Sequence, residues 1–344
     1  MKLFVTGVEG YIGSLLAPLL IERGHEVVGL DTGYYRDGWL YSEPSKMARF
    51  PTILDKDLRK ITEADLEGCD AVLHLAELSN DPLGQNKPEV THEINHRGSV
   101  NLAAKAKAMG IERFVYTSSC SVYGLGSGEF LSESDPVNPQ TAYAECKVLV
   151  ERDVGKMAAD DFSPVFLRNA TAYGASPRLR FDIVLNNLAG HAWTTKKIAM
   201  TSDGTPWRPL VHVLDICKAI VCAAEAPRDA IHNQVFNVGH SEDNYRVREI
   251  AEIVGEEFTG CEVTIGTSAG DNRSYRVNCD KIHTRLPGFS CDWNARKGAA
   301  QLRDLFERVE MDEATFNWRP YTRLKQLQYL IRTQQLDSDF YWKY

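Results

Sequence analysis

The first thirty-one residues contain the feature that most constrains the fold, a glycine-rich turn between two apolar runs. Residues 3–5 form a short apolar run typical of a buried strand, and Gly7, Gly10 and Gly13 follow it. Leucines at helical spacing come next, and a second apolar run ends at Asp31. The order of strand, glycine turn, helix, strand and terminal acid is that of a dinucleotide-binding βαβ unit.

Each part of this unit has a physical role in binding a dinucleotide. Glycine allows a tight turn and a close approach of the backbone to a pyrophosphate, while the helix N-terminus offers free N–H groups. Asp31 would accept hydrogen bonds from the adenosine ribose and repel a 2′-phosphate, which favours NAD over NADP. Arg36 is the residue that would instead meet a 2′-phosphate. The alternative, a turn that binds nothing, would not require the conformational entropy that these glycines cost.

Composition narrows the class of protein further. The chain has 344 residues, of which 43% are hydrophobic and 25% charged, as in globular proteins of one large or two smaller domains. A net charge of −8 without a basic block argues against nucleic acid and anionic membranes as partners. We find neither a membrane-spanning run nor the apolar region of a signal peptide, so we expect a cytoplasmic protein. The eight cysteines lack CxxC spacing, which predicts reduced, mostly buried thiols and no metal site.

Further apolar runs extend the predicted sheet, and polar residues follow them. Asp57 and Leu58 come where a third strand should end, and the acid would either bind an adenine amino group or cap a helix. Residues 71–76 are predicted as a buried strand, in which His74 is more typical of a core histidine than of a catalyst. Residues 77–88 form a polar loop at the carboxyl end of that strand, where ligands of parallel sheets bind.

A cluster of hydroxyl side chains ends the next predicted strand, which covers residues 114–117. Residues 117–124 read Thr-Ser-Ser-Cys-Ser-Val-Tyr-Gly, and Tyr143 and Lys147 follow on one face of a predicted helix. A tyrosine with a pKa of ~10 is a poor base, but a lysine cation and a positively charged nicotinamide nearby would lower that pKa. Proton transfer with a sugar hydroxyl then becomes feasible, and a serine would polarise the C–O group. Tyr-x-x-x-Lys alone is common on surface helices, and its position after a nucleotide-binding unit is what favours catalysis.

On these motifs the chain resembles the extended short-chain dehydrogenase/reductases, which are NAD-dependent nucleotide-sugar epimerases, dehydratases and reductases. The matching motifs are Thr6-Gly-x-x-Gly-x-x-Gly13, His74-Leu-Ala76, Asn95, Ser118-Ser119…Val122-Tyr123-Gly124 and Tyr143-x-x-x-Lys147. They are spread over much of the chain. The resemblance implies that Ser119, Tyr143 and Lys147 are the catalytic residues and that Asn95 supports the active site.

The motifs and the resemblance together define the expected site residues. Those expected to bind NAD are Gly7, Gly10, Tyr11, Ile12, Gly13, Asp31, Asp57, Leu58, Leu75, Ala76, Asn95 and Lys147. Those expected to bind a nucleotide-diphosphate sugar are Ser79, Asn80, Ser121, Tyr143, Asn169, Arg178, Arg208 and Arg273.

The resemblance also assigns roles in the second half of the chain. Arg208 lies in a segment like the family strand whose arginine grips the diphosphate, and a bidentate guanidinium suits a phosphate pair, although a surface ion pair is the alternative. Arg273 matches a second family arginine near the nucleotide, and Arg178 begins a segment of substrate-binding character. The usual family asparagine is replaced by Thr171, with Asn169 two positions earlier.

Several chemistries share this kind of active site. In the family that the chain resembles, dehydratases have an acid two residues before the tyrosine of V-Y-G. This chain has Ser121 at that position. C3/C5 epimerases have a cysteine there, whereas Cys120 is one residue away and would point to the other face of a strand. We therefore expect a nucleotide-sugar epimerase that acts through a transient keto sugar. The alternative is an NAD(P)H-dependent 4-ketoreductase of a nucleotide-linked deoxysugar; a 4,6-dehydratase or a non-catalytic NAD-binding sensor is less favoured.

Two carboxylates in the loop after the fourth strand occupy positions where many relatives have small or basic residues. Either Glu77 or Asp81 would serve as an extra base or bind sugar hydroxyls. Asp81 precedes Pro82, however, and this pair is more typical of a turn.

The expected fold class is α/β, with a Rossmann-type doubly wound parallel sheet and a smaller, discontinuous α/β substrate domain. Residues 1–170 with about 208–239 would form the NAD-binding domain, and about 171–207 with 240–344 the nucleotide-sugar-binding domain. A helix over residues 93–109 and the helix carrying Tyr143 have spare apolar surface, and the resemblance implies a homodimer through a four-helix bundle. A final helix over 319–336 and an aromatic tail over 340–344 would dock on the body.

Overall fold

The computed structural model describes residues 1–42, 51–79, 87–268 and 273–343. Its centre is a seven-stranded sheet of order β11-β7-β5-β4-β1-β2-β3, in which all neighbouring strands are parallel. The strands are β1 (Lys2–Thr6), β2 (Glu26–Asp31), β3 (Thr52–Asp55), β4 (Ala71–His74), β5 (Arg113–Ser119), β7 (Ser163–Asn169) and β11 (Gln234–Val238). The chain moves outward from β1 to β3 and then, on the other side, from β4 to β11, so the predicted doubly wound sheet is confirmed.

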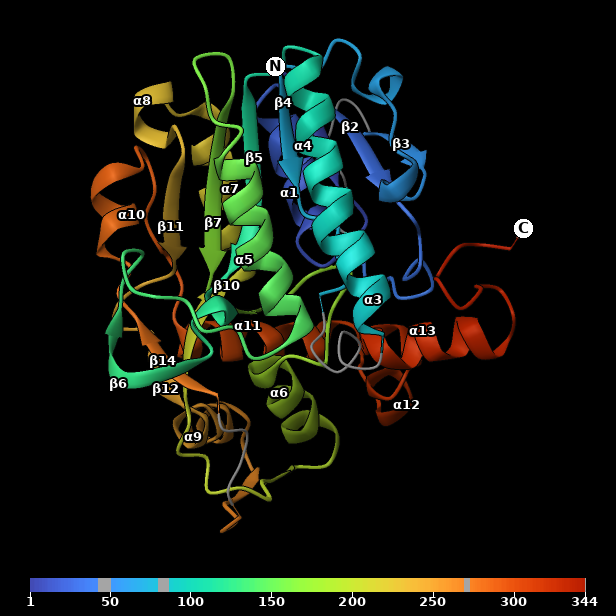
Figure 1. Ribbon diagram of the computed structural model, residues 1–344. Coiled ribbons are helices and arrows are strands. Elements are labelled where there is room, and N and C mark those ends of the chain that lie inside the picture. The colour runs from blue at the N-terminus through green and yellow to red at the C-terminus, as the bar shows by residue number, and fades with distance from the viewer. Residues whose placement is uncertain (43–50, 80–86, 269–272, 344) are drawn as a thin grey trace.

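Helices cover both faces of this sheet (Figure 1). One face is covered by α1 (Gly13–Glu22) and α7 (Val213–Glu225), the other by α4 (Ser99–Ala108) and α5 (Ala142–Gly155). The strand arrows in Figure 1 run downward, and most of the second half of the chain lies below their carboxyl ends. The carboxyl edge of the sheet therefore faces the second half of the protein.

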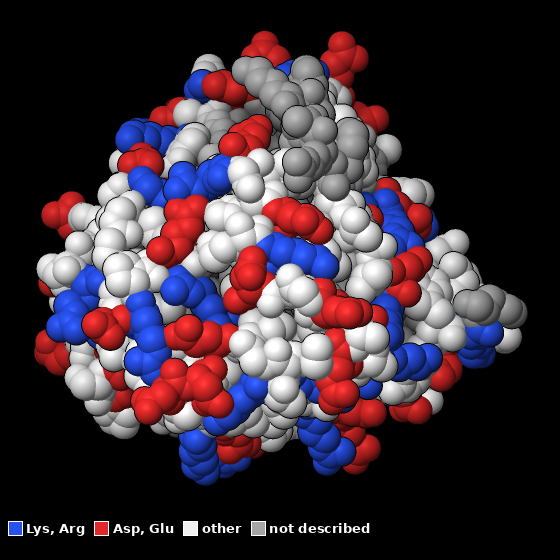
Figure 2. All heavy atoms as spheres, turned by 90° about the horizontal axis from the view of Figure 1, so that it is seen from above, with Lys and Arg blue, Asp and Glu red and all other residues white. Residues whose placement is uncertain are grey.

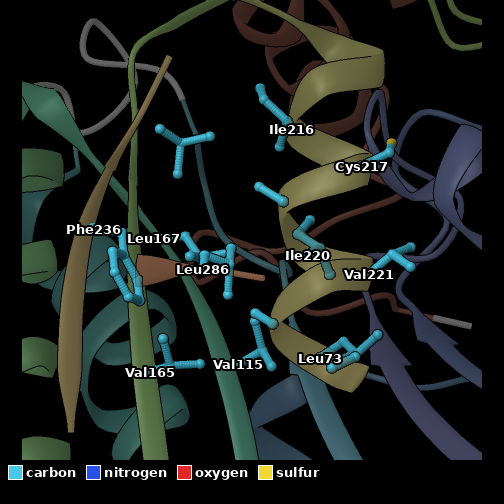
Figure 3. Close-up of a cluster of buried hydrophobic side chains, with 14 of the residues drawn as sticks. Leu73, Val115, Val165, Leu167, Ile216, Cys217, Ile220, Val221, Phe236 and Leu286 are labelled. Atoms are coloured by element: carbon cyan, nitrogen blue, oxygen red, sulfur yellow. The ribbon is translucent and has the colours of Figure 1, made fainter. Parts of the chain in front are cut away.

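Helix α7 shows how apolar spacing holds the layers together. Its side chains Ile216 and Ile220 point toward the sheet, where they pack with Leu73, Val115 and Leu167 (Figure 3). All five side chains are fully buried. Burying each aliphatic side chain contributes about 1.5–3 kcal/mol, so this interface is a main source of stability.

Smaller sheets and further helices complete the molecule. The sheets are β12 (Asn244–Arg246) with β10 (Trp207–His212) and β8 (Thr171–Tyr173), β13 (Glu262–Thr264) with β9 (Lys197–Ala199), and β14 (Ser274–Val277) with β6 (Leu125–Leu131). The helices are α6 (Val184–Thr194), α8 (Arg228–Ile231), α9 (Val247–Glu257), α10 (Asp280–Arg285), α11 (Ala295–Arg308), α12 (Glu313–Phe316) and α13 (Arg323–Arg332). Strand β10 pairs outside the seven-stranded sheet, and the division into two domains stays a prediction.

Several predicted elements have other bounds in the structure. The final helix predicted over 319–336 is a 3₁₀ segment, η5 (Arg319–Tyr321), followed by the shorter helix α13. The helix predicted over 93–109 begins earlier, as α3 (Pro88–Thr91), and continues through a π-helical segment, η3 (His92–Gly98), into α4. The strand predicted over 71–76 ends at His74, so Leu75 and Ala76 leave the sheet. Thr6 explains this end, because its hydroxyl accepts hydrogen bonds from the Leu75 and Ala76 amides at 3.1 and 3.0 Å.

The C-terminal tail packs on the body, as predicted. The Tyr34 hydroxyl donates to the carbonyl of Phe340 at 2.5 Å, and the Trp342 indole donates to the carbonyl of Thr32 at 2.7 Å. The guanidinium of Arg59 lies 3.5 Å from the ring centre of Tyr341. The tail therefore packs on the segments that follow β2 and β3.

Charged residues are mixed on the face seen in Figure 2, where lysines and arginines lie among aspartates and glutamates. In the part of the chain that the structure describes, none of the helices has the length and apolar character needed to cross a membrane.

Candidate active site

A cavity of about 770 Å³ opens at the carboxyl edge of the sheet. Its walls come from the glycine turn, the ends of β2, β4 and β5, helix α5, and segments of the second half of the chain. This is the edge at which doubly wound sheets bind their ligands. Most of the residues predicted from the sequence meet here.

The glycine turn is too tight for side chains at two of its positions. A Cβ on Gly13 would lie 2.1 Å from the carbonyl oxygen of Gly7, closer than any real contact. Gly7 has φ +72°, and a Cβ there would lie 3.0 Å from the amide nitrogen of Ala76. The turn therefore requires glycine and leaves backbone exposed to the cavity, which is the geometry that a pyrophosphate needs.

Asp31 lies in the cavity wall at the end of β2. Its carboxylate accepts hydrogen bonds from the amides of Glu9 and Gly33 at 3.0 and 2.8 Å. Burial raises the pKa of Asp31, and these two hydrogen bonds oppose the rise. Arg36 is held by two carboxylates, with contacts of 2.8 Å to Glu9 and 2.7 Å to Asp55. Because Arg36 is paired with these two acids, its charge is already balanced, which favours NAD over NADP.

Asp57 and His74 had two possible roles each. Asp57 caps the 3₁₀ segment η1 (Leu58–Lys60) by accepting from the Arg59 amide at 2.8 Å, and both Asp57 and Leu58 also line the cavity. His74 is a core residue, as predicted: it is fully buried and contacts the hydroxyls of Thr6 and Ser99 at 2.6 and 2.7 Å. Burial lowers the pKa of His74 to about 3, so the ring is neutral.

Helix α5 brings Tyr143 and Lys147 to the cavity wall beside Ser119. The helix begins at a fixed point because the Thr141 hydroxyl accepts from the Ala144 amide at 3.2 Å. The Lys147 ammonium lies 5.4 Å from the ring centre of Tyr143. The three predicted catalytic side chains therefore face one space.

A buried ion pair anchors the middle of α5 to the sheet. Glu151 and Arg168 contact each other at 2.7 Å, and their side chains are only 9% and 7% exposed. The Ser118 hydroxyl donates to Glu151 at 2.5 Å, and Arg168 donates to the Tyr123 hydroxyl at 2.9 Å. This network ties the catalytic helix to β5 and β7.

Two buried polar atoms in the cavity wall are candidates for contacts with a ligand. The Ser121 hydroxyl and the side-chain oxygen of Asn169 are buried, and neither has a hydrogen-bond partner among the described residues. Buried polar atoms are nearly always hydrogen-bonded in proteins, so these two suit the hydroxyls of a bound ligand. Cys120, in contrast, is a buried residue whose thiol lies 3.1 Å from the Arg168 carbonyl, and burial raises its pKa.

The predicted arginines differ in position. Arg208 and Arg273 line the cavity, and Arg208 donates to the carbonyl of Arg273. Arg178 does not line it; its guanidinium donates to the carbonyls of Tyr35 and Arg36 at 2.7 and 2.5 Å. The prediction for Arg178 is therefore not supported by the geometry, because this side chain is used to hold the loop after β2.

The other predicted residues differ in their relation to the cavity. Asn95 is fully buried and bonds both the amide and the carbonyl of Leu78, at 2.8 and 3.1 Å, so it holds the loop after β4 rather than lining the cavity. Ser79 lines the cavity. Asn80 and Asp81 lie outside the described residues.

Some residues that line the cavity were not predicted from the sequence. Arg180 lines the cavity and is held by Asp182 at 2.8 Å and by the Ser79 hydroxyl at 3.1 Å. Arg323, from the start of α13, lines the same region. Burial and the neighbouring Arg180 lower the pKa of Arg323 to about 10. Arg180 lies only two residues beyond Arg178, whereas nothing in the local sequence marks Arg323.

The residues present therefore fit NAD: a glycine turn too tight for side chains, an acid at the end of β2, and a lysine beside a tyrosine. Consistent with this, the chain matches the model of the NAD dependent epimerase/dehydratase family over residues 3–239. It belongs to that family.

Individual relatives agree with this assignment. The UDP-glucose 4-epimerase of Corynebacterium glutamicum is 30% identical over 304 residues, which cover 83% of this chain and 90% of the relative. That of Streptomyces lividans is 28% identical over 270 residues, or 74% and 80% of the two chains. The structure of MoeE5 in complex with UDP-glucose and NAD is 27% identical, with a TM-score of 0.77 over 90% of this chain and 100% of that chain. The predicted enzyme class and its NAD cofactor are thereby confirmed.

Proposed function

We propose that this protein is an NAD-dependent nucleotide-sugar epimerase that acts through a transient keto sugar. The observation that carries the proposal is the meeting of Ser119, Tyr143 and Lys147 with the glycine turn in one cavity. Similarity to curated UDP-glucose 4-epimerases supports a UDP-hexose as the first substrate to test.

The side chains of the cavity suit the proton transfers of this reaction. Tyr143 would accept the proton of a sugar hydroxyl and later return it, with Lys147 stabilising the phenolate. Ser119 would hydrogen-bond the same sugar oxygen, and its hydroxyl is already oriented because it accepts from the Ser121 amide at 3.1 Å. NAD, when bound, supplies the hydride acceptor and donor. Ser121 and Asn169 would bind sugar hydroxyls, and Arg208 and Arg273 the diphosphate.

A panel of UDP-, GDP-, CDP- and dTDP-linked sugars tests the proposal. Thermal shift selects the nucleotide, because a ligand that binds the folded state raises its melting temperature. Chromatography of the product then identifies the reaction. An epimer formed without net change in nicotinamide absorbance supports the proposal. Net NADH consumption would replace it with the ketoreductase, and loss of water with the dehydratase. Binding without turnover of any sugar would indicate a sensor.

Replacing Asp31 with asparagine should weaken NAD binding by about 10–100-fold, because a hydrogen bond to a charged group contributes about 1.5–3 kcal/mol. The preference for NAD over NADP should fall as well, since the repulsion of a 2′-phosphate is lost. Isothermal titration with each cofactor measures both effects. The matched control is Asp55→Asn. Among the contacts described, the exposed carboxylate of Asp55 contacts only Arg36, at 2.7 Å. This variant should therefore bind NAD with nearly the affinity of the wild type. Equal NAD affinity of the Asp31 variant and the wild type would contradict the assignment.

We also propose a homodimer in which α4 and α5 of two chains form a four-helix bundle. The supporting argument is the family resemblance together with the position of both helices on one face of the sheet (Figure 1). Light scattering should give twice the mass of one chain, and the mass of a single chain at micromolar concentration would contradict the proposal.

A further inference from the structure

Glu77 and Lys147 form a buried ion pair in the cavity wall, next to the proposed acid–base tyrosine. The Lys147 ammonium lies 2.7 Å from one carboxylate oxygen of Glu77, and the two side chains are 3% and 2% exposed. That oxygen receives no well-directed hydrogen bond, whereas the ammonium donates to the carbonyl of Thr117. Glu77 and Lys147 therefore lie together as a buried pair of opposite charges.

The carboxylate of Glu77 is held from its other side by the sheet. The hydroxyl of Tyr116, a fully buried residue of β5, donates to the second oxygen of Glu77 at 2.5 Å. Burial raises the pKa of Glu77, while the Lys147 ammonium and the Tyr116 hydroxyl oppose that rise. A carboxylate and an ammonium buried at this distance stabilise each other's charge.

The other titratable groups around this pair do not replace Glu77. His74 on β4 is neutral, and burial raises the pKa of the Cys146 thiol on α5 to about 12, so it is uncharged as well. Among the residues described, the neighbouring charged groups have partners of their own. Glu145 and Glu151 on α5 are paired with His92 and Arg168, and Arg180, which interacts with Tyr143, is paired with Asp182. Glu77 is thus the carboxylate in contact with Lys147 among the residues described.

We propose that Glu77 is a positioning residue that holds the Lys147 ammonium and offsets part of its electric field at Tyr143. The sign follows from Coulomb's law: the lysine cation favours the phenolate of Tyr143, and a carboxylate 2.7 Å from that cation opposes the effect. Tyr143 therefore holds its proton more strongly than it would beside an unpaired lysine.

This inference rests on the proposed function, because an epimerase needs its tyrosine in both directions. Tyr143 must take a proton from the sugar hydroxyl and then return it to the keto sugar. A positively charged cofactor and a lysine together would stabilise the phenolate so well that it becomes a weak base, and the first step, removal of the proton from the sugar hydroxyl, becomes slow. The negative charge of Glu77 balances the two proton transfers.

The test is a phenolate absorbance titration of the NAD-bound protein without sugar. The chain has 14 tyrosines, so the signal of Tyr143 is obtained by subtracting the titration of the Tyr143→Phe variant. Glu77→Gln should move the Tyr143 midpoint down by about one pH unit, because one negative charge is lost a few ångströms away. The rising limb of kcat/KM against pH should move in the same direction.

Three further variants separate electrostatics from structure. Glu77→Met removes the same charge with an apolar chain and should give the same shift, which keeps the test valid if the glutamine variant does not fold. Glu77→Asp keeps the charge and should restore a midpoint near the wild-type value. Glu225→Gln removes a carboxylate that pairs instead with Arg23 and His25, and should leave the midpoint unchanged.

A Tyr143 midpoint that stays in place or rises in both charge-removing variants would overturn the inference. The titration needs no substrate, so its outcome is separate from that of the proposed function. If the protein turns over a sugar but the Tyr143 midpoint does not shift, only the proposed role of Glu77 is excluded. If the Tyr143 midpoint shifts but the protein turns over none of the sugars, the epimerase assignment is excluded, and the electrostatic effect of Glu77 on Tyr143 is still supported.

Discussion

Replacing Tyr143 with phenylalanine should lower kcat for sugar epimerisation by about 10²–10⁴-fold, the range that a positioned general acid–base contributes. The substitution removes one oxygen and keeps the ring, so helix α5 and the cavity wall should stay intact. NAD should therefore still bind. Chiral product analysis over time measures the rate, and the absorbance of cofactor released on denaturation measures bound NAD.

The combination of the two readouts makes this prediction specific. Loss of both activity and NAD would assign Tyr143 a role in holding the cofactor instead of in proton transfer. Activity equal to that of the wild type would exclude it as the acid–base group. Melting temperature should change little, because Tyr143 lines the cavity and is not one of the buried core residues.

The parts of this site that sequence predicts well are those set by local geometry. Gly7 and Gly13 are required by a turn within one short segment, and Tyr143 and Lys147 meet because one helical turn separates them. The parallel, doubly wound sheet also follows from alternating strand and helix patterns. In each case the spacing along the chain determines the spacing in space.

Residues brought together by irregular segments, or by contacts between positions far apart in the sequence, are not predictable from local patterns. Arg178 and Arg180 lie in a segment without helical or strand periodicity, so nothing in the local pattern shows that the second, not the first, reaches the cavity. Arg323 reaches it because α13 packs beside Asp182, whose carboxylate accepts from the Arg323 amide at 3.1 Å across 141 positions of sequence. The ion pair of Glu77 and Lys147 has the same origin, since the sequence marks both residues but not their contact.

Replacing Arg168 with methionine should lower the free energy of unfolding by about 3–5 kcal/mol, the cost of leaving a buried carboxylate without its partner. Glu151 has little access to water, and its remaining contact, the Ser118 hydroxyl at 2.5 Å, does not balance its charge. Urea denaturation followed by far-ultraviolet circular dichroism measures the loss. The matched control is Arg296→Met, because Arg296 makes a similarly short contact with Glu256, 2.6 Å, on the surface of the protein; that variant should unfold close to the wild type.

The double variant Arg168→Met with Glu151→Leu decides whether the pair stabilises the fold or specifies a position. Apolar residues of similar volume often replace a buried ion pair with little loss, so the double variant should be more stable than Arg168→Met alone. It should nevertheless be a poorer enzyme, because the polar network that ties α5 to β5 and β7 would no longer set the position of Tyr143 against Ser119. Recovered stability together with reduced kcat would show that the pair exists to place the catalytic helix. Full recovery of both would mean that apolar packing alone can hold α5 in register.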